Sequence, residues 1–308
     1  MPPIDLSEGR FVFGAFESLD EDPISFVNEA AVIHALMSDD SRVNGCMTLG
    51  YNQEMYTGIT RRPTQSLSNC ELSYLDRQPI DIAKAIWQHR TYEELLTRLG
   101  VRVLPLPEEP KLPDAVFVED VAVVTEEVAV ITRSGAESRR AEAESVANVL
   151  AQFRPLQFIS APATLDGGDV MRIGKTFYAG LTPRTNAKGI AQLRSALAPH
   201  GYEVKAIRVH GCLHFKSACT YIGRGVVLGN PSWVDVGVFS AFEFIPVAEE
   251  EPAAGNSLTI DGTTILPSCY PKTGELVAAK GFRVETIDVS ELQKAEAGVT
   301  CMSIIFHD

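Results

Sequence analysis

Residues 193–230 read LRSALAPHGYEVKAIRVHGCLHFKSACTYIGRGVVLGN, and this stretch carries the pattern that decides the fold. Apolar residues spaced three and four apart predict a helix that ends near Gly201. A short run rich in Val and Ile then predicts a strand. After a loop, ACTYIG and GVVLGN predict two further strands. The stretch therefore describes one structural unit, made of a helix, a strand, a loop and a hairpin.

The same unit recurs along the chain. Its helix and strand return in YEELLTRLGVRVLPLP, VANVLAQFRPLQFIS and ELVAAKGFRVETIDV. Hairpins are predicted in AVFVEDVAVV with VAVITR, and in GDVMRI with TFYAGL. A weaker copy lies in NSLTIDGTTILP, where Asp261-Gly262 is a tight-turn signal, and MSIIF supplies the last strand.

A near-constant interval separates the polar or reactive residues that open these hairpins. They are Asp120, Asp166, His214, Asn256 and Cys301, at intervals of 46, 48, 42 and 45 residues. Such a period predicts a repeat architecture, and units arranged about an axis bring equivalent positions together. We therefore expect these side chains to converge.

The period also predicts the domain organisation. Residues 55–308 carry it, and we expect them to form a single catalytic α/β domain. Residues 1–54 do not fit it, so we expect an N-terminal extension packed on or beside the core.

Composition and charge narrow the possible partners. The chain has 308 residues, 45% of them hydrophobic, and a net charge of −13. Because an acidic chain repels phosphate, we expect no nucleic acid partner and a site suited to a small cation. The N-terminus lacks the pattern of a secretory signal, and no apolar stretch reaches the length of a membrane span. These features predict a cytoplasmic protein with free thiols and no membrane partner.

Cys301 and His214 are the candidate reactive pair. A nucleophilic cysteine needs a nearby cation or base to form its thiolate. Among the six histidines only His214 opens a repeated hairpin. A carboxylate from TLDGGD, either Asp166 or Asp169, would orient the imidazole.

Acidic and basic residues near the other hairpins suggest the ligand. Asp114, Glu119 and Asp120 lie within seven residues, the last two inside a predicted apolar strand, where charge is costly unless paired. Arg139 and Arg184 follow two hairpins and would suit a carboxylate. A free amino acid with a cationic side chain fits this combination.

Several long motifs resemble the dimethylarginine dimethylaminohydrolase family. They are LPDAVFVEDVAVV, ITRSGAESRR, TLDGGDVMRIGKTFYAGLTPRTNAKG, HFKSACTYIG and GVTCMSIIF. The resemblance covers residues 55–308. It implies the pentein fold, a five-bladed α/β-propeller with pseudo-fivefold repeats. It also implies hydrolysis of Nω-methylated arginines to citrulline and a methylamine, with no metal or organic cofactor.

The resemblance assigns a role to each candidate residue. It makes Cys301 the nucleophile, His214 the general acid and base, and Asp166 the carboxylate that orients the histidine. The substrate-binding residues it implies are Glu119 and Asp120 around the guanidinium, Asp114 at the α-amino group, Arg139 and Arg184 at the α-carboxylate, Leu72 in a flexible lid and Ser217 beside the histidine. One departure stands close to Cys301: Glu296-Ala297 replaces the usual Asp-Gly pair.

Two other functions stay open at this point. One is an arginine or other guanidine hydrolase of the same superfamily, because the sequence does not define the width of the pocket. The other is a non-catalytic arginine-binding or thiol-sensing protein. In every case the expected partner is a small molecule, and a homo-oligomer is compatible with the sequence.

Overall fold

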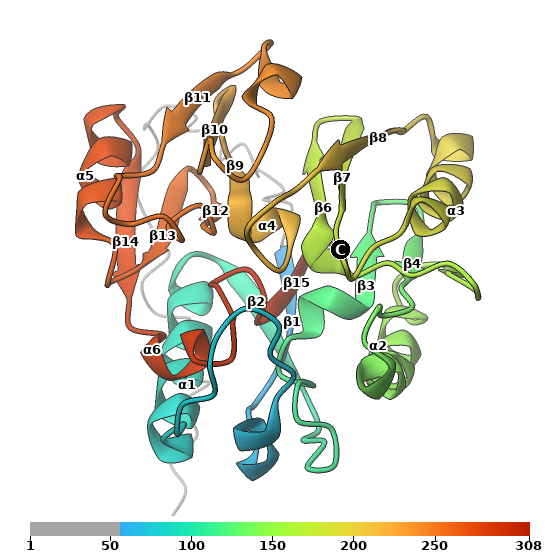
Figure 1. Cartoon of the computed structure of the whole chain (residues 1–308). Helices are drawn as coiled ribbons and strands as arrows, with labels where there is room; N and C mark the ends of the chain where they lie inside the picture. The colour runs from blue at the N-terminus through green and yellow to red at the C-terminus, as the bar shows by residue number, and fades with distance from the viewer. Residues whose placement is uncertain (1–55) are drawn as a thin grey trace, which may run out of the picture. The chain divides into compact units, whose positions relative to one another are not determined.

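A computed structural model describes residues 56–308, and they form five three-stranded sheets. The sheets stand around a common centre, with strand β15 close to it (Figure 1). This arrangement confirms the predicted five-bladed α/β-propeller with pseudo-fivefold repeats. The extension expected at residues 1–54 lies outside the described residues.

Four blades are built from consecutive strands in the same way. In each, the first strand pairs antiparallel with the second, and the second pairs parallel with the third. The blades are β3 (Ala122–Val124), β4 (Ala129–Ile131) and β5 (Leu156–Phe158); β6 (Val170–Ile173), β7 (Thr176–Leu181) and β8 (Glu203–Arg208); β9 (Cys219–Gly223), β10 (Val226–Gly229) and β11 (Glu243–Pro246); and β12 (Leu258–Ile260), β13 (Thr263–Pro267) and β14 (Arg283–Ile287).

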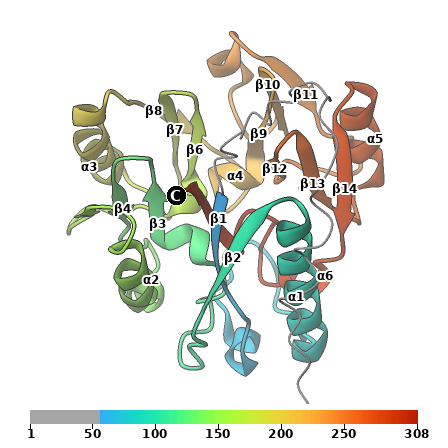
Figure 2. The ribbon, with the colours of Figure 1, turned by 180° about the vertical axis from the view of Figure 1, so that it is seen from behind.

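The fifth blade joins the two ends of the described chain. Strand β15 (Ser303–His307) pairs antiparallel with β1 (Tyr56–Arg61), and β1 pairs parallel with β2 (Val101–Leu106). Figure 2 shows β1 and β15 side by side near the centre. The last strand therefore takes the inner place of the first blade and closes the ring.

Helices connect the second and third strands of most blades and lie outside the ring of sheets (Figures 1 and 2). They are α1 (Ile82–Arg98), α2 (Ala143–Leu150), α3 (Ala187–Leu197) and α5 (Pro271–Ala279), while the blade of β9–β11 has only the 3-10 turn η7 (Val236–Phe239) in this place. Two short helices, α4 (Phe215–Ala218) and α6 (Ser290–Gln293), lie in loops.

Side-chain caps fix two helix starts. Asp81 accepts a hydrogen bond from the backbone nitrogen of Lys84 at 3.0 Å, and Asn186 accepts one from that of Gly189 at 2.8 Å. No helix within residues 56–308 is long and apolar enough to cross a membrane.

The hairpin turn predicted at Asp261-Gly262 is confirmed. Both residues have positive φ, 44° and 72°, as a two-residue turn with the twist of the flanking strands requires.

The prediction that Glu119 and Asp120 lie inside a strand is wrong. Both lie on the 3-10 turn η3 (Val118–Val121), and β3 begins only at Ala122. The turn packs against Gly167, where an added Cβ would lie 2.0 Å from the carbonyl oxygen of Glu119. The charged side chains thus leave the strand and reach partners that a pleated strand would not offer.

Closure of the ring depends on apolar packing under β15. Phe306 is 5% exposed and meets Phe153 edge-on with ring centroids 5.2 Å apart. It shares an apolar cluster with Ile59 of β1 and Leu150 of α2.

We expect Phe306→Ala to lower the free energy of unfolding by about 3–5 kcal/mol, because it leaves a cavity at the closing strand. Phe158→Ala is the matched control, since Phe158 is 62% exposed on an outer strand, and it should change stability by less than about 0.5 kcal/mol. Denaturant unfolding of both variants measures the difference. Equal losses would show that β15 packing does not hold the ring together.

Candidate active site

One narrow cavity brings together six of the residues predicted from the sequence. Its walls include Asp114, Asp120, Arg139, Arg184, His214 and Cys301. They come from four different blades, as the repeat period predicted for Asp120, His214 and Cys301. Asp166 does not line the cavity itself but contacts His214, which does.

Cys301 lies two residues before β15. Its sulfur accepts a hydrogen bond from the backbone nitrogen of Gly298 at 3.3 Å, and its carbonyl oxygen accepts one from that of Glu119 at 3.2 Å. Burial, followed by the charges of Glu119 and Asp120, raises the thiol pKa to about 12. The free protein therefore holds a neutral thiol that a bound cation would help to ionise.

Carboxylates surround the imidazole of His214. Nε2 lies 3.1 Å from Asp166 Oδ2, and Nδ1 lies 3.7 Å from Asp120 Oδ1. Burial lowers the imidazole pKa, but Asp120, Asp169 and Asp166 outweigh it and raise the pKa to about 9. The imidazole consequently carries a proton at neutral pH.

The geometry separates the two acids of TLDGGD, either of which could have oriented the histidine. Asp166 contacts the imidazole, whereas Asp169 accepts a hydrogen bond from the backbone nitrogen of Phe215 at 2.8 Å and another from the Thr182 hydroxyl at 2.7 Å. Asp169 thus anchors the chain directly after His214.

The two arginines differ in how strongly they are paired. Arg139 donates to Asp120 at 2.7 Å and to Glu142 at 2.8 Å. Arg184 is 6% exposed, and its Nη1, 3.6 Å from Asp166 Oδ2, has no hydrogen-bond partner among residues 56–308. A buried guanidinium with an unsatisfied donor is costly, so Arg184 is ready to receive an anion.

Asp114 is buried at the edge of the same cavity. Its two carboxylate oxygens lie 3.3 and 3.0 Å from the backbone nitrogen of Glu71. Burial raises its pKa, and Arg139 partly offsets this effect. A cation bound here would oppose the effect of burial and stabilise the charged carboxylate of Asp114.

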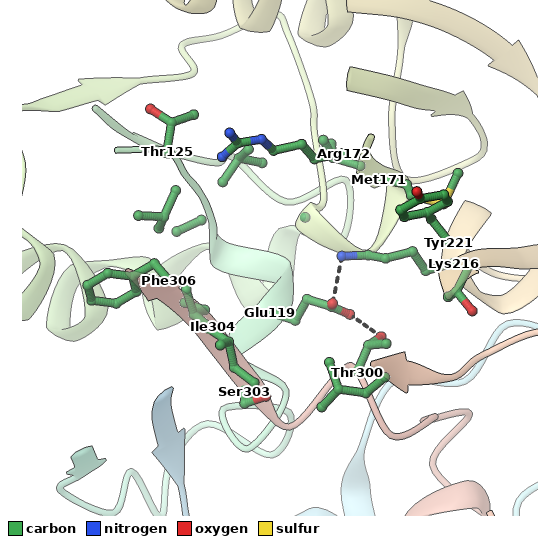
Figure 3. Close-up of a pocket in the computed structure, with 18 of the residues that line it drawn as sticks. Glu119, Thr125, Met171, Arg172, Lys216, Tyr221, Thr300, Ser303, Ile304 and Phe306 are labelled. Atoms are coloured by element: carbon green, nitrogen blue, oxygen red, sulfur yellow. Dashed lines mark hydrogen bonds and ion pairs between the residues drawn. The ribbon is translucent and has the colours of Figure 1, made fainter. Parts of the chain in front are cut away.

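Glu119 lines a different cavity from its neighbour Asp120. Figure 3 shows Lys216 and Thr300 reaching its two oxygens, each at 2.6 Å. This cavity, of about 340 Å³, is lined by residues of the first strands of the blades. Glu119 and Thr300 therefore line one cavity, while their neighbours in the sequence, Asp120 and Cys301, line the other.

The remaining two predicted residues lie beside the cavity. Ser217 lines a neighbouring cavity with Trp233 and Asn256. Leu72 is half-buried and packs against the apolar cluster that Cys301 also touches.

Asn256 is a site residue whose role the sequence did not suggest. Its side chain accepts from the Thr300 backbone nitrogen at 3.1 Å and donates to the Thr300 hydroxyl at 3.0 Å and to the Lys216 carbonyl at 3.1 Å. It packs so closely that a Cβ on Gly298 would lie 2.2 Å from it. Asn256 thereby fixes the loop that carries Cys301. Its place in the repeat period was the available signal.

Asp120, Asp166 and His214 also place ligand atoms within 4.8 Å of one another, a spacing that suits a metal ion. A protonated imidazole has no free lone pair for a metal. A metal ion here would have to displace the proton that the surrounding carboxylates hold on His214.

Fold and site together define a class: α/β-propeller proteins with a cysteine, a carboxylate-held histidine and paired acids and arginines at the centre. A sequence model of the family described as N,N dimethylarginine dimethylhydrolase, eukaryotic, matches residues 66–228. The N(G),N(G)-dimethylarginine dimethylaminohydrolase of Pseudomonas aeruginosa is 38% identical over 80% of this chain and 98% of its own. That of Streptomyces coelicolor is 40% identical over 80% of this chain and 95% of its own. The chain belongs to the dimethylarginine dimethylaminohydrolase family.

Solved structures agree with this assignment. A cysteine-to-serine mutant of the Pseudomonas aeruginosa protein, complexed with citrulline, superposes with a TM-score of 0.79 at 37% identity, over 82% of this chain and all of that one. The N-terminal domain of ArgZ, a cyanobacterial arginine dihydrolase, shares the fold with a TM-score of 0.74 at 17% identity, over 81% of this chain and 97% of its own.

The neutral thiol of Cys301 can be tested by alkylation with iodoacetamide. Since the thiolate fraction below the pKa rises about tenfold per pH unit, the rate at Cys301 should still be climbing between pH 8 and 10. Peptide mass spectrometry follows each cysteine separately, and the exposed Cys269 serves as the internal reference for reagent reactivity. A rate at Cys301 that levels off below pH 8 would mean that the free protein already holds a thiolate.

Proposed function

We propose that this protein hydrolyses Nω-methylated L-arginine, both asymmetric dimethylarginine and monomethylarginine, to L-citrulline and dimethylamine or methylamine. The observation that supports this most is the pairing, in one narrow cavity, of a thiol and an imidazolium with Arg184, whose Nη1 has no hydrogen-bond partner among residues 56–308. A methylated arginine would present its guanidinium to the first two and its carboxylate to the third.

Substrate binding activates the nucleophile in this proposal. Glu119 and Asp120 supply negative charge near Cys301, and in the free protein that charge suppresses thiolate formation. A guanidinium cation bound between Asp120 and the sulfur reverses the effect and lowers the thiol pKa, while Glu119 adds negative charge from the neighbouring cavity. Asp120 also orients the guanidinium carbon toward the sulfur.

The reaction then proceeds in two halves. The Cys301 thiol releases its proton to solvent as the cation binds, the thiolate attacks the guanidinium carbon, and the imidazolium of His214 gives its proton to the departing amine. The C–N bond breaks and a thiouronium remains on Cys301. Neutral His214 next takes a proton from water, and the hydroxide attacks the same carbon. The C–S bond breaks, the proton of the added hydroxyl passes to the Cys301 sulfur, and citrulline is released. The steps consume only substrate and water.

The other residues hold the reacting groups in place. Asp166 and Asp120 keep His214 protonated before the first step and fix its ring. Arg184, aided by Arg139, binds the α-carboxylate, and Asp114 binds the α-ammonium group. We assign Leu72 to a lid over the cavity, and Ser217 to the pocket wall beyond the histidine.

Two solved structures of dimethylarginine dimethylaminohydrolases support this proposal. The relative's cysteine-to-serine mutant holds citrulline, and a histidine-to-glycine mutant of a dimethylarginine dimethylaminohydrolase forms an adduct with S-methyl-L-thiocitrulline. Both compounds are amino acids with a urea-like or isothiourea-like end.

A reducing compartment suits this chemistry, and we propose the cytoplasm. The nucleophile acts only as a reduced thiol, and the five cysteines in residues 56–308 are free. The residues of the described cavity come from one chain, and a homo-oligomer is compatible with the proposed reaction.

Steady-state kinetics on arginine, monomethylarginine and asymmetric dimethylarginine test the proposed substrate. Each methyl group that fills an apolar niche contributes about 0.8 kcal/mol, so kcat/KM for the dimethylated form should exceed that for arginine about tenfold or more. Cys301→Ser should abolish turnover, and Cys269→Ser should leave it intact. If arginine were used as well as both methylated forms, the general guanidine-hydrolase alternative would replace this proposal.

Arg184→Ala tests how the amino-acid end is bound. Loss of a charge-assisted contact should weaken binding of monomethylarginine by about 1.5–3 kcal/mol. Methylguanidine, which lacks the carboxylate, should bind the variant nearly as well as the wild type. Arg98→Ala, at a surface arginine paired with Glu285, is the control. Calorimetry that found equal losses for the two ligands would remove Arg184 from the carboxylate site.

A further inference from the structure

The segment Glu71–Arg77, here called the lid, borders the Cys301 cavity at Glu71 and is anchored mainly through its backbone. Tyr74 and Leu75 are 48% and 50% exposed, so their side chains contribute little packing. At its C-terminal end Arg77 donates to the carbonyl oxygens of Ser68 at 2.7 Å and Cys70 at 2.6 Å. The tip of the lid needs another anchor.

Glu296 supplies that anchor with a single oxygen atom. Its Oε1 accepts hydrogen bonds from the backbone nitrogens of Ser73, Tyr74 and Leu75 at 2.9, 2.5 and 2.7 Å. Three consecutive N–H groups that converge on one point form an anion-binding nest, for which a carboxylate is a strong ligand. The contact joins residues more than 220 positions apart.

The backbone at Glu296 is held in an unfavourable conformation. Its φ is +60°, in the left-handed region that residues other than Gly, Asn and Asp seldom adopt. Such strain persists where surrounding contacts over-determine it, and the three lid bonds are contacts of this kind.

Glu296 also belongs to the wall of the Cys301 cavity, as does Asp114. Each of these carboxylates therefore contacts the lid on one side and the cavity on the other, because Asp114 accepts from the backbone nitrogen of Glu71. The second oxygen of Glu296 is buried and has no hydrogen-bond partner within residues 56–308.

We propose that Glu296 is a positioning residue that latches the lid over bound substrate. The inference rests on the proposed function for the identity of that substrate. The latch sets the fraction of molecules whose lid is closed, and apparent affinity scales with that fraction. Glu296 contacts no reacting atom, so it acts on retention of the substrate and leaves the bond-breaking step to Cys301 and His214.

Glu296→Gln is the central variant, because it keeps the shape and the backbone conformation while removing the charge. Glu296→Ala removes the acceptor entirely, and Glu285→Ala is the control at a surface acid of β14. If the closed fraction falls to about a tenth, KM for monomethylarginine rises about tenfold while kcat stays within about threefold. Glu296→Gln should lie between the wild type and Glu296→Ala.

Hydrogen–deuterium exchange of the lid in the ligand-free protein gives a second readout that needs no turnover. Exchange at residues 73–75 should speed up about tenfold in Glu296→Ala, and should be unchanged in Glu285→Ala. Unchanged lid exchange in Glu296→Ala, or a fall in kcat with KM unaltered, would overturn the latch. A wild type that turned over no methylarginine would instead refute the proposed function, and the exchange result would still decide whether the latch exists.

Discussion

Antiparallel pairing of β15 with β1 is the constraint on which the site depends. It joins Ser303 to Thr60 across almost the whole described chain and places Cys301, two residues earlier, at the centre of the ring. Without this pairing the other blades would still have their strands and helices, but the thiol would have no fixed position relative to His214. Apolar packing under Phe306 and the Asn256 side chain on the Cys301 loop both support the same closure.

Buried charge determines the resting state of that centre. Asp120 and Asp166 keep His214 protonated, while Glu119 and Asp120 keep Cys301 neutral. This arrangement favours a cation near the sulfur and, because Nη1 of Arg184 has no hydrogen-bond partner among residues 56–308, a further anion near Arg184. An amino acid with a guanidinium side chain supplies both, so binding and activation are two consequences of one electrostatic arrangement.

The repeat period predicted the part of the site that follows from the fold. Asp120, His214 and Cys301 occupy equivalent places in their blades, so an axis was enough to bring them together. The direction of Glu119 could not be read in this way, because adjacent residues of the turn η3 face different cavities. The hydrogen bonds between Glu296 and the lid could not be predicted either. They join segments that are distant in the sequence, and their donors are backbone nitrogens, which every residue except proline has.

Mass spectrometry of the Cys301 peptide after rapid acid quench tests the central claim most directly. During turnover of monomethylarginine, the account predicts a covalent adduct on Cys301 of the same mass as that formed from asymmetric dimethylarginine, because both lose their methylated amine before the quench. The adduct should be absent from Cys301→Ser. Turnover to citrulline with no adduct at Cys301, or an adduct that retains the methyl groups, would contradict the account.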